Sequence, residues 1–159
     1  MKTPTLLMVY YTIYTSRPRQ PMSKKLLDEI TEVSNKNNVP RNVTGMLLAL
    51  ENRYLQYLEG DELEVEELFE KIKNDGRHHE VMRWVKGFTS EPVFKGWSMG
   101  SWMLSNDEIE SLTAVKDLKD FIDDPQNQTL QSTRFLNMMN ELLQTWLAHE
   151  PERAARLKS

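Results

Sequence analysis

The feature that most constrains the fold is the order of strand-like and helix-like segments in the first hundred residues. Five segments have the β-branched, aromatic or alternating composition of strands, and two carry apolar side chains at helical spacing. In chain order they are strand 5–15, a helix after Ser23, strands 43–51 and 54–60, a helix after Asp61, and strands 81–90 and 93–102. This β-α-β-β-α-β-β order predicts an α+β, ferredoxin-like sheet, rich in antiparallel pairs, with two helices on one face.

Capping residues and helix breakers indicate where the two helices begin and end. Ser23 and Asp61 each precede an apolar stripe, and both residue types commonly cap a helix N-terminus. The segment 35–42 contains four asparagines and a proline and is expected to be a loop. The segment 74–80 is expected to close the second helix.

The composition changes near residue 104. Residues 105–125 are acidic and helix-like, and residues 131–150 carry aromatic and aliphatic side chains on one helical stripe. We therefore expect one domain over residues 1–103 and a helical extension over residues 104–159 that packs on the domain.

Composition excludes several classes of protein. The chain is 39% hydrophobic and 28% charged, with a formal net charge of −4, which fits a globular protein and argues against binding of nucleic acid. It has no cysteine, so disulfides, thiolate zinc sites and cysteine nucleophiles are excluded. No apolar run approaches the roughly 20 residues of a membrane span, and the N-terminus lacks the cleavage site of a signal peptide. We therefore expect a cytoplasmic protein that does not act at a membrane.

Common catalytic motifs are also missing from the sequence. The six glycines form neither a GxGxxG turn nor a phosphate-binding loop. No GxSxG or HExxH motif is present. The adjacent His78 and His79 would need carboxylate ligands to complete a metal site, so no metal is expected. An ordinary nucleotide enzyme or hydrolase is therefore unsupported.

Several polar or aromatic residues stand out, although each has an ordinary structural explanation by itself. Gln56 has apolar neighbours in the strand 54–60 and would most simply face solvent. Tyr14 would be a core residue whose hydroxyl group reaches water. Asn37 and Asn38 would cap a helix. Arg77 and His78 would lie at a solvated helix end. Trp97 and Met99 would pack in the core.

Together these residues form an ordered pattern of six short motifs. In chain order the motifs are Tyr14-x-Ser16, Asn37-Asn38, Val43-Thr44-Gly45, Gln56-x-Leu58-Glu59-Gly60, Asp75-x-Arg77-His78 and Trp97-x-Met99. With this order and spacing the pattern resembles the BLUF domain, a family that senses blue light with a flavin. The resemblance covers about the first hundred residues, and the two-helix extension is similar to that of short, single-domain members.

The resemblance implies a flavin held non-covalently between the helices and the sheet, usually FAD, with FMN or riboflavin as alternatives. A side-chain amide presents a donor and an acceptor side by side, which complements the carbonyl and N–H on the pyrimidine edge of the ring. Asn38 would clamp this edge, with Asn37 beside it. The other residues implied to bind the flavin, by bordering or lining the site, are Tyr14, Ile30, Ser34, Gln56, Arg77 and His78.

The resemblance also implies a photochemical switch rather than an enzyme. Tyr14 would give an electron and a proton to the excited flavin, and Gln56 would be left rearranged, because rotating or tautomerising an amide exchanges its donor and acceptor. Trp97 or Met99 would relay the change to the extension. No kinase, cyclase or phosphodiesterase pattern is present, so we expect signalling through a downstream protein or through a homo-oligomer.

One departure from the family pattern concerns tyrosines near the N-terminus. Tyr10 lies on the same strand face as Tyr14, and Tyr11 follows it. An extra tyrosine near the flavin would be a competing electron donor.

Two other functions stay open from the sequence. A ferredoxin-like fold also serves acylphosphatase-type hydrolases and small monooxygenases, because a fold does not fix a function. A colourless regulatory module would explain the helices but not the spacing of the tyrosine, asparagine, glutamine, tryptophan and methionine. A yellow colour that shifts in blue light would separate the sensor from both alternatives.

Overall fold

The computed structural model describes residues 8–50, 53–92 and 100–105, and the single positions 107, 120, 137, 140, 141 and 144. Trp97 and Met99 lie outside the described residues, as do most of the helices expected at 105–125 and 131–150. The four described positions within 131–150 are helical and exposed. Their spacing puts them on one helix face, as expected for the polar side of an amphipathic helix.

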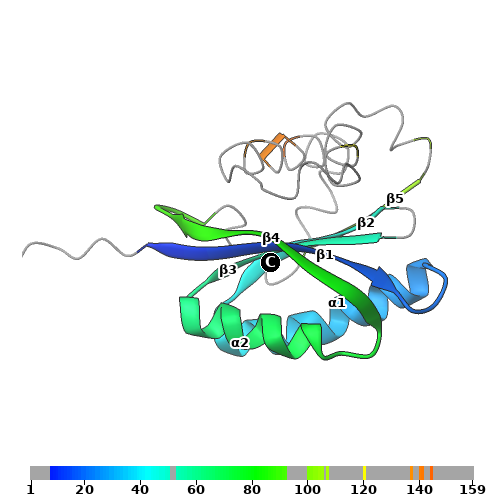
Figure 1. Cartoon of the computed structure of the whole chain (residues 1–159), viewed down its shortest axis with the longest axis horizontal. Coiled ribbons are helices and arrows are strands. Elements are labelled where there is room, and N and C mark those ends of the chain that lie inside the picture. Colours follow the sequence, from blue (N-terminus) through cyan, green and yellow to red (C-terminus); the bar gives the residue numbers. More distant parts are fainter. Residues whose placement is uncertain are drawn as a thin grey trace, which may run out of the picture.

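The described strands form one mixed sheet with both helices on the same face (Figure 1). The strands are β1 (Val9–Pro18), β2 (Thr44–Leu50), β3 (Arg53–Gly60), β4 (His78–Thr89) and β5 (Gly100–Leu104). Their spatial order is β4-β1-β3-β2-β5, and all neighbours are antiparallel except β2 and β5. The helices are α1 (Lys24–Asn38) and α2 (Glu62–Lys73). The predicted ferredoxin-like α+β fold is confirmed.

Both helices begin at the predicted capping residues. The Ser23 Oγ accepts a hydrogen bond from the Leu26 N–H at 3.1 Å, and the Asp61 Oδ2 accepts one from the Glu64 N–H at 3.3 Å. Each cap satisfies a backbone amide that the first turn of a helix leaves unpaired. No helix in the described part of the chain is long and apolar enough to cross a bilayer.

The prediction of a loop at 35–42 is wrong in part, because α1 continues through Asn38 into a short 3-10 turn, η1 (Val39–Arg41). Pro40 lies near the start of η1, where its missing N–H costs no helical hydrogen bond. The turn ends at Asn42, which adopts the left-handed conformation with φ of 54°. Asparagine tolerates this conformation better than most residues.

The segment 74–80 is also partly strand. β4 begins at His78 rather than at residue 81, because its antiparallel ladder with β1 extends to the pairs Arg17–His79 and Pro18–His78. His78 is therefore held on the sheet, next to the end of β1.

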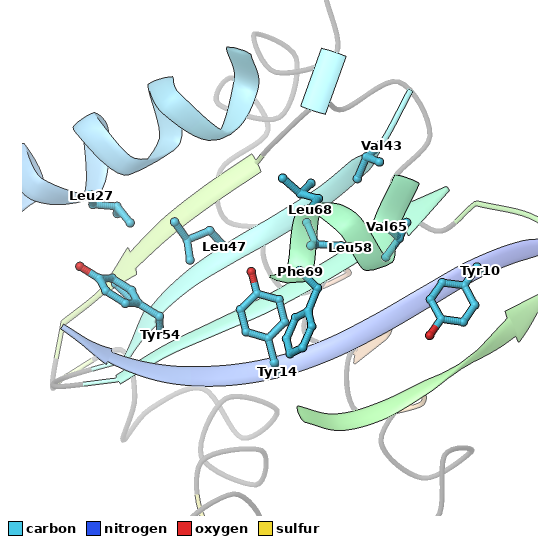
Figure 2. Close-up of a cluster of buried hydrophobic side chains, with 11 residues drawn as sticks. Tyr10, Tyr14, Leu27, Val43, Leu47, Tyr54, Leu58, Val65, Leu68 and Phe69 are labelled. Carbon is cyan, nitrogen blue, oxygen red and sulfur yellow. The ribbon is translucent and has the colours of Figure 1, made fainter. Parts of the chain in front are cut away.

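The central strands are buried on both faces. The core on the helix side contains Tyr10, Tyr14, Leu27, Val43, Leu47, Ala49, Tyr54, Leu58, Val65, Leu68 and Phe69 (Figure 2). The buried apolar residues on the opposite face include Tyr11, Ile13, Met46, Leu48, Leu55 and Tyr57. A sheet covered on both faces explains why its strands read as almost continuous apolar segments.

β2 and β3 approach each other closely at Gly45. A Cβ atom at this position would lie 2.1 Å from the carbonyl oxygen of Tyr57, a distance that no side chain can adopt. The glycine in the Val43-Thr44-Gly45 motif is therefore required by backbone packing beside β3.

Candidate functional site

One cross-strand row of the sheet carries two of the residues singled out in the sequence. Tyr14 on β1 pairs in register with Gln56 on β3, and Gln56 pairs with Leu47 on β2. Residues in register on neighbouring strands point to the same face, and this row faces the helices because Tyr14 and Leu47 belong to the core on that side. The Tyr14 hydroxyl donates a hydrogen bond to the Oε1 of Gln56.

Both partners of this hydrogen bond are buried. Tyr14 is 0% exposed and Gln56 is 3% exposed, so the interpretation that Gln56 faces solvent is wrong. Burial raises the pKa of the Tyr14 phenol well above its ordinary value. The phenol therefore stays protonated and keeps its proton directed at the amide oxygen.

A narrow pocket lies beside Gln56, between the two helices. Its lining comes from both helices, from β3 and from the segment that leads into β4: Ile30, Val33, Ser34, Asn37, Gln56, Ile72, Asp75, Arg77 and His78. The pocket is partly open, and its volume of about 30 Å³ is small beside the roughly 300–1,000 Å³ of a typical ligand site. A flat ring system would therefore have to widen the pocket as it enters.

The structure brings six of the eight residues predicted to bind the cofactor to this pocket: Ile30, Ser34, Asn37, Gln56, Arg77 and His78. Tyr14 contacts the pocket indirectly, through its hydrogen bond to Gln56. Asn38 does not line it, but the Asn38 side chain is buried at the adjoining end of α1. Three further residues, Val33, Ile72 and Asp75, also line the pocket and were not predicted to do so. Asp75 belongs to one of the six motifs, and Val33 and Ile72 are apolar residues of the two predicted helices.

A hydrogen-bonded histidine closes one side of the pocket. The Nε2 of His78 lies 2.7 Å from the carbonyl oxygen of Ile72, and its Nδ1 lies 3.3 Å from the Ser16 Oγ. A carbonyl oxygen can only accept, so Nε2 carries a proton. The ring is thus fixed between β1 and the end of α2.

Two basic side chains are held by residues that line the pocket. Asp75 Oδ1 accepts hydrogen bonds from the Arg77 N–H at 2.9 Å and from the Arg77 Nε at 3.2 Å. Burial by itself raises the pKa of Asp75, but its contacts with Arg77 outweigh burial and hold the pKa below its ordinary value. Lys71 on α2 donates to the Asn37 Oδ1 at 3.1 Å, which ties the two helices together.

The set of groups around the pocket suits a planar ligand with a polar edge and an anionic tail. Side-chain amides offer paired donors and acceptors, apolar helix residues offer flat contacts, and a guanidinium group can pair with phosphate. Within the described ranges, no group of three or more His, Asp or Glu side chains is arranged to hold a metal ion. The donor set therefore fits a flavin nucleotide.

Comparison with known families decides the assignment. The sequence model of the family described as "BLUF: Sensors of blue-light using FAD" matches residues 9–100, which is more than half of the chain. The chain belongs to the BLUF family. FAD is the flavin by which this BLUF family is defined.

Curated relatives of this BLUF chain are light-regulated proteins. The blue light- and temperature-regulated antirepressor BluF of Escherichia coli is 32% identical over 75 residues, which cover 47% of this chain and 19% of the antirepressor. The photoactivated adenylate cyclase subunit beta of Euglena gracilis is 28% identical over 109 residues, which cover 69% of this chain and 12% of the cyclase subunit. The chain thus spans less than a fifth of the length of these relatives.

Solved structures share the BLUF fold. BlsA in its photo-activated state aligns with a TM-score of 0.64 and 25% identity, covering 86% of this chain and 95% of BlsA. A bacterial light-regulated adenylyl cyclase aligns with a TM-score of 0.66 and 26% identity, covering 84% of this chain and 40% of the cyclase. The dark state of the BLUF protein BlrB, with a TM-score of 0.68, 23% identity and coverage of 87% and 97%, supports the fold alone.

Proposed function

We propose that this chain is a blue-light photoreceptor that holds FAD non-covalently between α1 and α2 and switches through Tyr14 and Gln56. The observation that carries the proposal is the buried hydrogen bond from the Tyr14 hydroxyl to the Gln56 amide, at the edge of the pocket. A phenol whose proton already points at an acceptor is placed to lose an electron and a proton together. When bound, FAD supplies the absorption of blue light and accepts the electron.

Gln56 can occupy two hydrogen-bonded arrangements without a large movement. With its Oε1 turned to Tyr14, its Nε2 group directs donors toward the pocket. If the amide rotates, Nε2 donates to the phenol oxygen and Oε1 faces the pocket, because a phenol accepts as well as donates. The two arrangements present opposite hydrogen-bonding groups to a ligand, so Gln56 acts as a two-state switch.

Asn38 and the remaining pocket residues would hold the cofactor. Asn38 would clamp the pyrimidine edge of the ring with Asn37 beside it, and Arg77 and His78 would border the ring and the chain attached to it. Ile30 and Ser34 line the pocket from α1. Support comes from the shared pocket of five of these residues and from the buried position of Asn38 at the end of α1.

The output would leave the domain through its last strand. Leu47 pairs in register with Gln56 on one side and with Ser101 on β5 on the other. A rearranged Gln56 is therefore two strands away from β5. Trp97 and Met99 precede β5 in the chain, and we assign them as the relay. From there the signal passes into residues 104–159 and on to a downstream signalling protein, without catalysis by this chain.

Asn38→Ala is expected to lose most of the bound flavin. Leaving buried polar groups unpaired costs about 1–3 kcal/mol for each group, which corresponds to roughly a 5- to 150-fold weaker affinity for each group left unpaired. FAD content after purification and the dissociation constant on reconstitution measure the effect.

Asn74→Ala is the matched control for this substitution. Asn74 caps the other helix, where its exposed Nδ2 donates to the Glu70 carbonyl, and its loss should leave the flavin content unchanged. Undiminished FAD content and affinity in Asn38→Ala would refute the assignment of Asn38.

A further inference from the structure

A cation lies beside Tyr14, on the side away from Gln56. Arg83 on β4 pairs in register with Tyr14, so Gln56, Tyr14 and Arg83 form one row across β3, β1 and β4. The Arg83 Cζ lies 4.0 Å from the centre of the Phe69 ring. Phe69 in turn packs edge to face against Tyr14, with ring centres 5.0 Å apart (Figure 2). A single aromatic ring thus separates the guanidinium from the phenol.

Glu66 on α2 balances the charge of Arg83. The Arg83 Nη2 donates to one Glu66 carboxylate oxygen at 2.9 Å, and the Tyr10 hydroxyl donates to the other. Burial by itself raises the pKa of Glu66, but these two hydrogen bonds hold the pKa below its ordinary value, so Glu66 is ionised. The Arg83 and Glu66 side chains are only 23% and 33% exposed, which limits screening of their charges by solvent.

Tyr10 belongs to this ion pair rather than to the Gln56 switch. Its hydroxyl is directed at Glu66, and its ring lies nearer the start of β1 than the contact between Tyr14 and Phe69 (Figure 2). Tyr14 therefore has its hydrogen-bond acceptor, Gln56, on one side and the ion pair of Arg83 and Glu66 on the other.

We propose that Arg83 and Glu66 are positioning residues whose charges cancel beside Tyr14, so that neither charge alone makes Tyr14 harder or easier to oxidise, with Phe69 holding the cation in place. The inference rests on the proposed function. When Tyr14 loses one electron to the photoexcited flavin, its phenolic proton follows the hydrogen bond to the Gln56 Oε1. A nearby cation opposes the loss of an electron and a nearby anion favours it, so the two charges of the intact pair offset each other.

The fluorescence lifetime of the bound flavin tests this, because electron transfer from Tyr14 shortens the lifetime. Arg83→Gln leaves the Glu66 anion unbalanced and should shorten the lifetime, whereas Glu66→Gln leaves the Arg83 cation and should lengthen it. We expect changes of at least about twofold in these opposite directions. Arg83→Lys keeps the charge and should stay near the wild-type lifetime, as should the double variant Arg83→Gln with Glu66→Gln.

Two matched controls separate charge from packing. Glu70→Gln and Lys73→Gln remove the same charges from exposed positions of α2 and should leave the lifetime unchanged. In a Tyr14→Phe background, the substitutions of Arg83 and Glu66 should have no effect on the lifetime. Lost packing would move both single variants in the same direction, and that result would overturn the proposal.

A flavin-free measurement tests the ion pair itself. Urea unfolding of the apoprotein should show that Arg83→Gln and Glu66→Gln are coupled, with the double variant less destabilised than the sum of the single variants. Strict additivity would overturn the proposal.

A protein that binds no flavin would overturn both the proposed function and this inference, whereas a normal red shift with lifetimes insensitive to both charges would overturn this inference alone.

Discussion

Gln56→Leu is expected to remain yellow and to lose the red-shifted state completely. Leucine fills a similar volume in the row between Tyr14 and Leu47, but it can neither accept the Tyr14 proton nor exchange a donor for an acceptor. Absorption spectra before and after blue light, at matched FAD content, measure the loss.

The same substitution also leaves the buried Tyr14 hydroxyl without its acceptor, at a cost of about 1–3 kcal/mol in stability. An unfolding curve recorded in parallel shows whether the variant is still folded under the conditions of the light experiment. Gln20→Leu, at an exposed position, should keep the normal shift. A red shift of wild-type size in Gln56→Leu would rule out the glutamine switch.

Tyr14→Phe should bind flavin and fail to form the normal red-shifted state. Phenylalanine keeps the edge-to-face contact with Phe69 but removes both the phenolic proton and the readily oxidised ring. Since the electron donor is gone, the excited-state lifetime of the flavin should also lengthen. Difference spectra and time-resolved fluorescence check the two expectations on one sample.

Tyr54→Phe is a close control for this variant. Tyr54 is 2% exposed and lies on the same face of the sheet, and its hydroxyl has no hydrogen-bond partner in the described part of the chain. It should keep the full light response. If Tyr14→Phe instead showed a normal shift, the donor would be another residue, such as Tyr10, Tyr11 or a tryptophan.

Local signals in the sequence were sufficient for much of the fold. The caps at Ser23 and Asp61 depend only on residues within one helical turn, and the order of strands and helices along the chain follows from periodicity. The end of α1 was not predictable in this way. α1 continues through Asn35 and Asn37 and ends at the buried Asn38, so burial at this end of the helix outweighs the preference of asparagines for turns.

For the site, too, the features that depend on local sequence were predictable, and those that depend on contacts between distant parts of the chain were not. Six ordered motifs predicted most of the pocket, but the burial of Gln56 depends on helices that are distant in the chain, and a glutamine between apolar neighbours gives no sign of them. The position of Arg83 beside Tyr14 depends on an irregular register between Ile13 and Tyr14. Such a bulge changes which residues face each other and leaves no reliable trace in the alternation of apolar residues.

Illumination of the purified wild-type protein tests most directly whether this chain is a flavin-based light sensor. We predict a yellow protein whose flavin absorption moves slightly to longer wavelength in blue light and returns in the dark, over repeated cycles, with the FAD still bound. A colourless protein, or a bound flavin whose spectrum stays unchanged or bleaches irreversibly under the same light, would contradict the proposed function.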